Sequence, residues 1–351
     1  MAKAGNDYPH SEREFRAWFQ TEEDCLDYLD WLRWGDELVC SRPGCGTKVP
    51  ARKVTSRVWR CPVCTTSVSR TAGTIFEGTR VPLTLWFSAA WEMTMDKGGI
   101  SATALKRRLD LKSHQTAWTM LHKYRSAMAL SGRDKLTGTV EVDETAIGGK
   151  KSGKRGRGAV GKTEVAIAIE LKEDPRGFGR VRLRVIPDAS SKTLAAFLDE
   201  VVEPGSTIVT DAWGSYPAAT KGKYVHEPKN QTTSPQKPHE LLPGVHRVAS
   251  LLKRWILGTF QGSVSAAHLP AYLDEFTFRF NRRHSRDRGL LFFRLMSLSA
   301  NAPPVTYGEL VKANHPGNKT PKATDGAHLA PRGLKAPQPT RPWRGVTAKS
   351  L

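Results

Sequence analysis

The chain has 351 residues, of which 39% are hydrophobic, and a formal net charge of +20. A chain of this length is expected to contain two or three domains. The positive charge favours nucleic acid over a membrane surface as the partner, and no segment approaches the ~20 apolar residues of a membrane span. Because the N-terminus also lacks the apolar region of a secretory signal, we expect a cytoplasmic protein that associates with the nucleoid.

The first two segments are a helical one, residues 1–35, and a cysteine-containing one, residues 36–70. The second segment carries two close pairs of cysteines, and these are Cys40, Cys45, Cys61 and Cys64. In a reducing compartment such pairs indicate a metal site rather than disulfides. Four thiolates from two tight turns are suited to a tetrahedral structural Zn²⁺. We therefore predict a zinc ribbon whose metal contributes to folding.

Residues 71–136 have a pattern of helices separated by short turns. A short helix over 101–109 leads through a tight turn to a second helix that begins after Ser113. This is the arrangement of a helix-turn-helix motif, whose second helix enters the major groove of DNA. The side chains expected to face the groove are Lys112, His114, Gln115 and Thr116. The alternative is a helical hairpin that only packs on a core.

Residues 137–300 combine strand and helix patterns, which indicates an α/β domain. The expected strands and helix are, in chain order, 139–143, 164–171, 179–186, helix 191–203 and strand 207–210. Three strands, a helix and a strand is the order of the ribonuclease H-like fold, which we predict for this domain. The first of these strands ends on Asp143, and the last is followed directly by Asp211.

Three other segments are polar or basic. Cationic groups in the glycine-rich loop 149–158 are predicted to grip DNA phosphates without reading bases; the alternative is a solvated hairpin tip. These groups are Lys150, Lys151, Lys154 and Arg155. Residues 217–245 are polar and proline-containing, which is typical of a functional or disordered loop. The proline-rich segment 301–351 is predicted to be a disordered basic tail.

The two strand-end aspartates carry the chemical prediction. Carboxylates delivered by neighbouring strands are suited to hold two Mg²⁺ or Mn²⁺ ions, the arrangement used in phosphodiester chemistry. A third ligand is needed, and the sequence offers His246 and Glu275. The alternative for Asp143 and for Asp211 is an ordinary acid at a strand end or in a turn.

Four segments together resemble the insertion-sequence transposases of the ISXO2-like family, which belong to the DDE superfamily. They are residues 140–149, 209–216, 252–259 and 272–283. The zinc ribbon and parts of the helix-turn-helix segment share the resemblance, which covers roughly residues 12–300. It implies a ribonuclease H-like catalytic domain of the DDE type, which cuts and rejoins DNA at the ends of its own element.

In this family the third catalytic position is Glu, Asn or His and is followed seven residues later by Lys. His246 and Lys253 have this spacing. The resemblance therefore implies that His246 is the third ligand and that Lys253 contacts a DNA phosphate, with Arg254 as a further DNA-binding residue. A neutral imidazole can ligate a metal, although it suits Mg²⁺ less well than a carboxylate does. Glu275 is the alternative ligand, or it orients Lys253 and a neighbouring arginine.

We therefore predict a DNA transposase that binds the inverted-repeat ends of its element and catalyses metal-dependent cleavage and strand transfer. Its expected partners are double-stranded DNA, both element ends and target, and further copies of itself in a dimer or larger oligomer. Two alternatives remain. One is a zinc-ribbon regulator with an inactive nuclease domain, and the other is a ribonuclease H-like junction nuclease.

Overall fold

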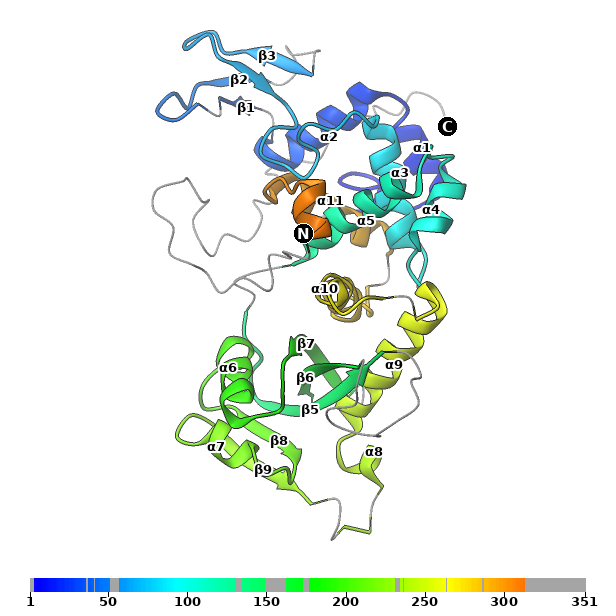
Figure 1. Cartoon of the computed structure of the whole chain (residues 1–351). Helices are drawn as coiled ribbons and strands as arrows, with labels where there is room; N and C mark the ends of the chain where they lie inside the picture. The colour runs from blue at the N-terminus through cyan, green and yellow to red at the C-terminus, as the bar shows by residue number, and fades with distance from the viewer. Residues whose placement is uncertain are drawn as a thin grey trace. The chain divides into compact units, whose positions relative to one another are not determined.

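The chain folds into two compact units in a computed structural model (Figure 1). The structure describes residues 3–35, 37–40, 42–50, 57–129, 134–148, 162–172, 177–230, 234–235, 237–262, 264–285 and 287–312. Unit 1 takes its residues from Met1–Ala129 and Ser285–Leu351, and unit 2 from Leu130–His284. Within the described part of the chain, no helix has the length and apolar character needed to cross a membrane.

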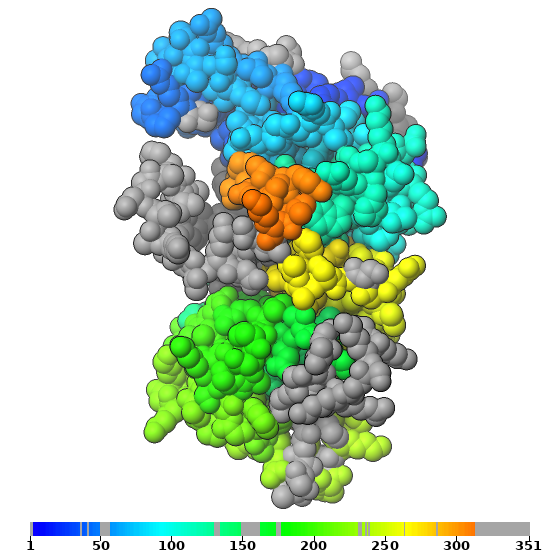
Figure 2. All heavy atoms as spheres, viewed as in Figure 1, coloured from blue at the N-terminus to red at the C-terminus, as the bar shows by residue number. Residues whose placement is uncertain are grey.

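Unit 1 is a helical bundle with an attached pair of hairpins. Its helices are α1 (Glu12–Trp18), α2 (Glu22–Trp34), α3 (Leu83–Met95), α4 (Ala102–Arg108), α5 (His114–Met128), α11 (Gly289–Asn301) and α12 (Tyr307–Val311). Buried aromatic rings form the core: Phe292 of α11 lies 5.6 Å from Phe15 and 6.2 Å from Phe87, centroid to centroid. Figure 2 shows the orange residues of the C-terminal helices lying against the cyan surface of unit 1.

The two hairpins form the zinc-ribbon region. Strand β1 (Glu37–Val39) pairs with β2 (Lys48–Pro50), and β3 (Val58–Arg60) pairs with β4 (Ser67–Ser69), both antiparallel. Such short strands cannot bury a core of their own. Their small core instead contains Leu38, Trp59 and Val68 together with the cysteine sulfurs.

Arg70, which follows β4, ties this region to α2. Its guanidinium is fully buried and pairs with Glu23, Asp27 and Asp30 on one side of that helix. Asp30 is only 1% exposed, and burial raises the pKa of its carboxyl to about 7 although Arg70 acts to lower it. Arg70 therefore fixes the position of α2 relative to the end of β4, because a buried guanidinium left without its partners would cost roughly 3–5 kcal/mol.

Unit 2 is built on one mixed sheet of five strands. They are β5 (Thr139–Ile147), β6 (Thr163–Leu171), β7 (Phe178–Ile186), β8 (Thr207–Asp211) and β9 (Val225–Lys229). Their order across the sheet is β7-β6-β5-β8-β9. Strand β6 runs antiparallel to its neighbours β5 and β7, whereas β5, β8 and β9 are parallel. The longest and central strands are rich in Val and Ile, which favour a sheet covered on both faces.

Helices cover the two faces of this sheet (Figure 1). The helices of unit 2 are α6 (Ser191–Val201), α7 (Tyr216–Thr220), α8 (Pro238–Leu241), α9 (Pro243–Phe260) and α10 (Leu269–Phe280). Apolar side chains of α6 and α7 pack on the face that carries Val140 and Val142. Those of α9 and α10 pack on the opposite face, which carries Val209 and Ile147.

Three segments differ from the sequence expectation. Residues 217–245 contain most of α7, all of β9 and α8, and the start of α9 rather than one long loop. Unit 2 ends at His284, before the boundary expected at residue 300, because α11 packs on α2, α3 and α5 of unit 1. Within the segment expected to be disordered, residues 307–311 form α12, capped by Thr306; residues 313–351 lie outside the described part.

Candidate functional site

Asp143 and Asp211 occupy equivalent positions on two adjacent parallel strands. Glu141 of β5 pairs with Val209 of β8, and continuing this register by two residues brings Asp143 level with Asp211. Because side chains alternate between faces along a strand, both aspartates share the face of Val209, which packs against α9. Adjacent strands lie about 4.8 Å apart. This spacing is compatible with carboxylates that share a bound cation.

Hydrogen bonds from two backbone N–H groups and from a tyrosine hydroxyl orient the acidic side chains around Asp143 and Asp211. Asp143 Oδ1 accepts a hydrogen bond from the N–H of Glu144 at 2.8 Å, and Asp211 Oδ1 accepts one from the N–H of Trp213 at 3.2 Å. The buried Tyr216 hydroxyl donates to Glu144 Oε1 at 2.6 Å. Burial raises the pKa of Tyr216, and the charges of Glu144, Asp143 and Asp211 raise it further. The carboxylates of Asp143, Glu144 and Asp211 therefore form one cluster of negative charge near Tyr216.

Glu141 docks the start of α9 onto the strand that carries Asp143. Its carboxylate is 1% exposed, and Oε2 accepts the N–H of Val245 at 3.0 Å. Burial raises the pKa of Glu141, while the N–H groups of Val245 and Gly244 act to lower it. A Cβ on Gly244 would lie 2.8 Å from Glu141 Oε2 and 3.0 Å from Ile169 Cγ2. A larger residue here would force the Glu141 carboxylate or its neighbours to move, so glycine allows the helix to approach the strand closely.

His246 and Lys253 follow this contact on α9, seven residues and two turns apart. The Nε2 atom of His246 is buried and has no hydrogen-bond partner among the described residues. Burial lowers the pKa of His246, and electrostatic interactions with His239 and Lys253 lower it further. Partial desolvation lowers the pKa of Lys253, as does Lys162, whereas the Asp143 carboxylate acts to raise it. Lys253 is therefore within electrostatic range of Asp143, and His246 favours its neutral form.

Glu275 has a different environment from the aspartates. It is fully buried on α10, and its Oε1 accepts a hydrogen bond from Arg279 Nε at 2.9 Å. Helix α10 packs on β7, which is separated from β5 by β6. A buried carboxylate already paired with a guanidinium is suited to a structural role.

The four cysteines form a compact tetrad. The sulfur of Cys40 lies 3.6 Å from that of Cys64, and the sulfur of Cys45 lies 3.7 Å from that of Cys61. A zinc tetrahedron with Zn–S bonds of about 2.3 Å separates its sulfurs by about 3.8 Å. The donor set and spacing therefore fit a structural Zn²⁺, as predicted. Among the described residues, no other group of three or more His, Cys, Asp or Glu side chains converges in this way, so the aspartates and His246 are not a preassembled metal cage.

The predicted DNA-reading residues lie around the start of α5. Lys112, His114 and Gln115 are exposed. Thr116 is half-buried, and its Oγ1 lies 2.9 Å from the hydroxyl of Ser113, which also caps α5. Arg254 is exposed on α9. The predicted phosphate-gripping residues Lys150, Lys151, Lys154 and Arg155 lie outside the described residues.

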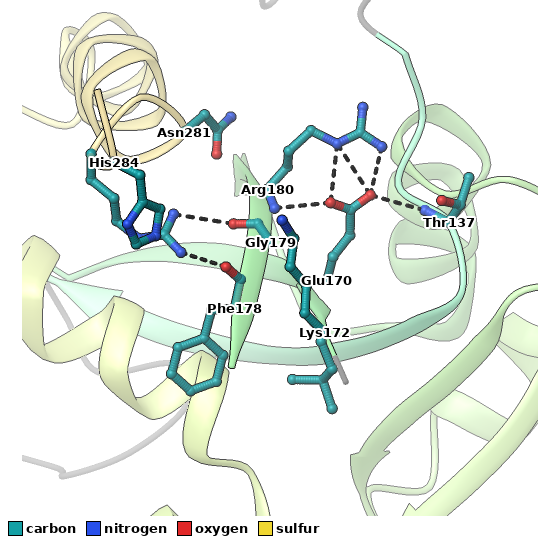
Figure 3. Close-up of a pocket in the computed structure, with 10 residues that line it drawn as sticks. Thr137, Glu170, Lys172, Phe178, Gly179, Arg180, Asn281 and His284 are labelled. Carbon is teal, nitrogen blue, oxygen red and sulfur yellow. Dashed lines mark hydrogen bonds and ion pairs between the residues drawn. The ribbon is translucent and has the colours of Figure 1, made fainter. Parts of the chain in front are cut away.

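A hollow of about 430 Å³ lies beside Thr137, just before the start of β5 (Figure 3). Glu170 accepts the N–H of Thr137 and forms an ion pair with Arg180, and Arg180 also donates to the carbonyl of Lys135. Arg283 donates to the carbonyls of Gly179 and Phe178. These contacts hold the entry of β5 in place, and they use the guanidinium donors that a ligand would otherwise meet. We therefore assign this hollow a structural role.

Two domain models match the chain. The "ISXO2-like transposase domain" matches residues 135–281, which coincides with the described part of unit 2, and the "Transposase zinc-ribbon domain" matches residues 20–67. The matched regions define a transposase with a zinc ribbon. The chain therefore contains an ISXO2-like transposase domain together with a transposase zinc ribbon.

A curated relative supports the same assignment. The chain is 25% identical to "Uncharacterized protein in transposable element ISH50" of Halobacterium salinarum, over 74% of this chain and 91% of that protein. The relative is a protein of an insertion element, in agreement with the resemblance found in the sequence.

Sequence reasoning did not find Glu141, Gly244 or Trp213 as parts of this site. A signal for Glu141 existed, because it lies two residues before Asp143 and therefore on the same face of β5. Its partner Val245 is 104 residues away in the chain, and no local pattern links the two.

Proposed function

We propose that this transposase cleaves DNA at the ends of its element and joins those ends to a target, with Asp143 and Asp211 as metal ligands. The observation that carries the proposal is the position of the two aspartates on adjacent parallel strands, opposite the helix that carries His246 and Lys253. A sheet order of β7-β6-β5-β8-β9 with only β6 reversed supports a ribonuclease H-like fold for unit 2.

Each residue of the proposed site has a separate role. Asp143 and Asp211 would hold two Mg²⁺ or Mn²⁺ ions, which activate the attacking oxygen and stabilise the leaving oxygen when bound. His246 presents a neutral imidazole nitrogen as the third ligand. Lys253 would bind a phosphate near the scissile bond, where its charge offsets the negative charge that gathers on the phosphate oxygens. Glu141 keeps α9 in register with β5.

DNA recognition is assigned to unit 1. Helices α4 and α5 with their short turn support a helix-turn-helix, and the exposed Lys112, His114 and Gln115 would reach the groove. Two chains on paired element ends would account for a dimer or higher oligomer as the active form.

The decisive experiment uses a duplex that bears the inverted repeats flanking the coding region. Wild-type protein with Mg²⁺ should nick this duplex and join it to target DNA, and binding should persist in Asp143→Asn. Binding without any cleavage by the wild type would favour the regulator. Cleavage of branched DNA without preference for the repeats would favour the junction nuclease.

The third ligand is tested on the same DNA. His246→Ala should reduce joining by about 100-fold or more. His246→Glu should retain activity, because a carboxylate oxygen would take the place of the imidazole nitrogen as the metal ligand. Loss of joining in Glu275→Gln with normal thermal stability, together with normal joining in His246→Ala, would transfer the role to Glu275.

A further inference from the structure

A second groove, of about 730 Å³, is lined by Trp213 and Ser215, which follow Asp211 in the loop after β8. It lies between the start of β6, the turn from β7 into α6, and the loop after β8, and it is lined by Lys162, Asp188, Ser190, Trp213 and Ser215 among others. Its volume is in the range of small-molecule binding sites. We call it the Trp213 groove, and all of it lies within unit 2.

Trp213 connects this groove to the proposed catalytic carboxylates. Its backbone N–H donates to Asp211 Oδ1 at 3.2 Å, and its indole Nε1–H donates to the carbonyl of Ala189 at 3.4 Å. The side chain is nevertheless 42% exposed, which makes it one of the few large apolar side chains of the described chain left accessible to solvent. The indole is thus anchored through its ring nitrogen, partly open to solvent, and two residues from Asp211.

The groups around the indole indicate what the groove accepts. Asp188 lies in the groove and is held ionised, since donors from Ser190 and Thr193 lower its pKa. Its charge disfavours a phosphate at this point, whereas the exocyclic amino groups of cytosine and adenine are donors that suit a carboxylate. Lys162, also lining the groove, lies within electrostatic range of Lys253. A nucleotide with its base in the groove near Asp188 and its phosphates toward Lys162 and Lys253 would place a favourable partner beside the carboxylate and beside the lysines.

We propose that the Trp213 groove binds one unstacked base of the DNA strand, next to the scissile phosphate, with the base stacked on the indole. The proposal rests on the proposed function, since it requires DNA at Asp143 and Asp211. Drawing a base out of a duplex costs a few kcal/mol, and stacking on an aromatic ring offsets part of that cost. Trp213 would thus open the duplex locally and give the carboxylates access to the phosphate.

The test compares fully paired element ends with ends that carry a single mismatch at each position around the mapped cleavage site. On paired DNA, Trp213→Ala should cleave roughly 10-fold or more slowly, as expected from the loss of one stacking contact, and Trp213→Phe should stay near wild type. A mismatch at the flipped position should restore most of the rate to Trp213→Ala, because that base no longer needs to be unpaired. Val225→Ala, which trims an exposed apolar side chain (56%) on the edge strand β9 of unit 2, should behave as wild type on every substrate.

A direct readout uses 2-aminopurine in place of each base near the cleavage site, with Ca²⁺ in place of Mg²⁺. Wild type and Trp213→Phe should change its fluorescence at one position only, and Trp213→Ala should give a different signal there while retaining the wild-type melting temperature. Equal cleavage of paired DNA by wild type and Trp213→Ala, or a defect that no mismatch position relieves, would overturn the groove assignment. Absence of cleavage by the wild type would instead overturn the proposed function.

Discussion

The contact between Glu141 and Gly244 shows how single residues set the geometry of the candidate site. Asp143 and Asp211 could be predicted from the sequence because each follows an apolar run, which is a local pattern. Asp211 does end β8, whereas β5 was expected to end at Asp143 and instead continues to Ile147, because its pairing with β6 extends that far. Glu141 could not be predicted, since its role depends on the start of a helix 104 residues away. The missing side chain of Gly244 and the buried carboxylate of Glu141 together fix the distance between β5 and α9. The positions of His246 and Lys253 follow from it.

Gly244→Ala should therefore reduce strand joining by about tenfold or more. The added Cβ would lie 2.8 Å from Glu141 Oε2, so either the buried Glu141 carboxylate or the start of α9 must shift, and such overpacking typically costs about 1–3 kcal/mol of stability. The matched control is Gly258→Ala on the same helix, where no atom lies within 4 Å of the added Cβ. That variant should join normally and gain up to about 1 kcal/mol from helix propensity. Equal joining by the two variants would contradict the positioning role.

Asp30 predicts a pH dependence of stability. Its pKa is raised to about 7 in the folded protein by burial, so its contribution to stability is present below the unfolded pKa of about 4 and is lost as pH rises toward 7. Asp30→Asn has no charge to gain and should lack this loss. Between about pH 6 and pH 8, the unfolding free energy of wild type should fall relative to Asp30→Asn by on the order of 1 kcal/mol. Urea unfolding at both pH values measures this, and parallel curves would refute it.

At the scale of elements, the sequence predicted most of unit 2 because its strands are apolar and its helices amphipathic. Strand β9 was not predicted, since it is an edge strand of mostly exposed polar residues around Pro228 and gives no periodic signal. The place of α11 was also not predicted. Its apolar face indicates burial, but only the fold shows that it packs with α2, α3 and α5. Local patterns identify elements, and they do not say which distant element a helix will join.

The zinc ribbon should depend on its metal for structure. The hairpins β1–β2 and β3–β4 bury little apolar area, so removing the ion leaves them without enough stabilisation. A strong chelator, or Cys61→Ser, should release about one zinc per chain and raise amide exchange in residues 57–69, while exchange in the strands of unit 2 stays unchanged. Retained protection of 57–69 in the metal-free protein would show that the ribbon folds without zinc.

The second element to test is α5 with the turn before it. If Lys112 contacts a phosphate, Lys112→Ala should weaken binding to all DNA sequences and lower the slope of log affinity against log salt by about 1. Gln115→Ala should instead weaken binding to the inverted repeats more than to random DNA, by about 1–3 kcal/mol if it reads a base. Arg16→Ala, at an exposed arginine paired with Glu12 on α1, serves as the control for loss of one surface charge. Salt slopes identical to wild type in Lys112→Ala would remove this residue from the interface.

For the molecule as a whole, the chain combines a net charge of +20, a zinc ribbon, a helical unit and a sheet that carries Asp143 and Asp211. The charge and the paired cysteines could be read from the sequence, as could the family, because its motifs are contiguous. The division into units could not, since unit 1 contains both ends of the chain. In the proposed function, the positive charge would raise the local concentration of DNA, and the groups around Asp143 and Asp211 would carry the chemistry.

The most direct test of this account is strand joining by Asp143→Asn and Asp211→Asn under single-turnover conditions with Mg²⁺. Each substitution keeps the shape of the side chain and removes one negative charge from the proposed metal site. We predict that each lowers the joining rate by about 1,000-fold or more, a loss of roughly 4 kcal/mol in transition-state stabilisation, with unchanged affinity for the inverted repeats. Asp199→Asn, at an exposed acid paired with Lys223, should join at the wild-type rate. Joining by Asp143→Asn or Asp211→Asn at a rate near that of Asp199→Asn would contradict the assignment of this edge of the sheet as the catalytic site.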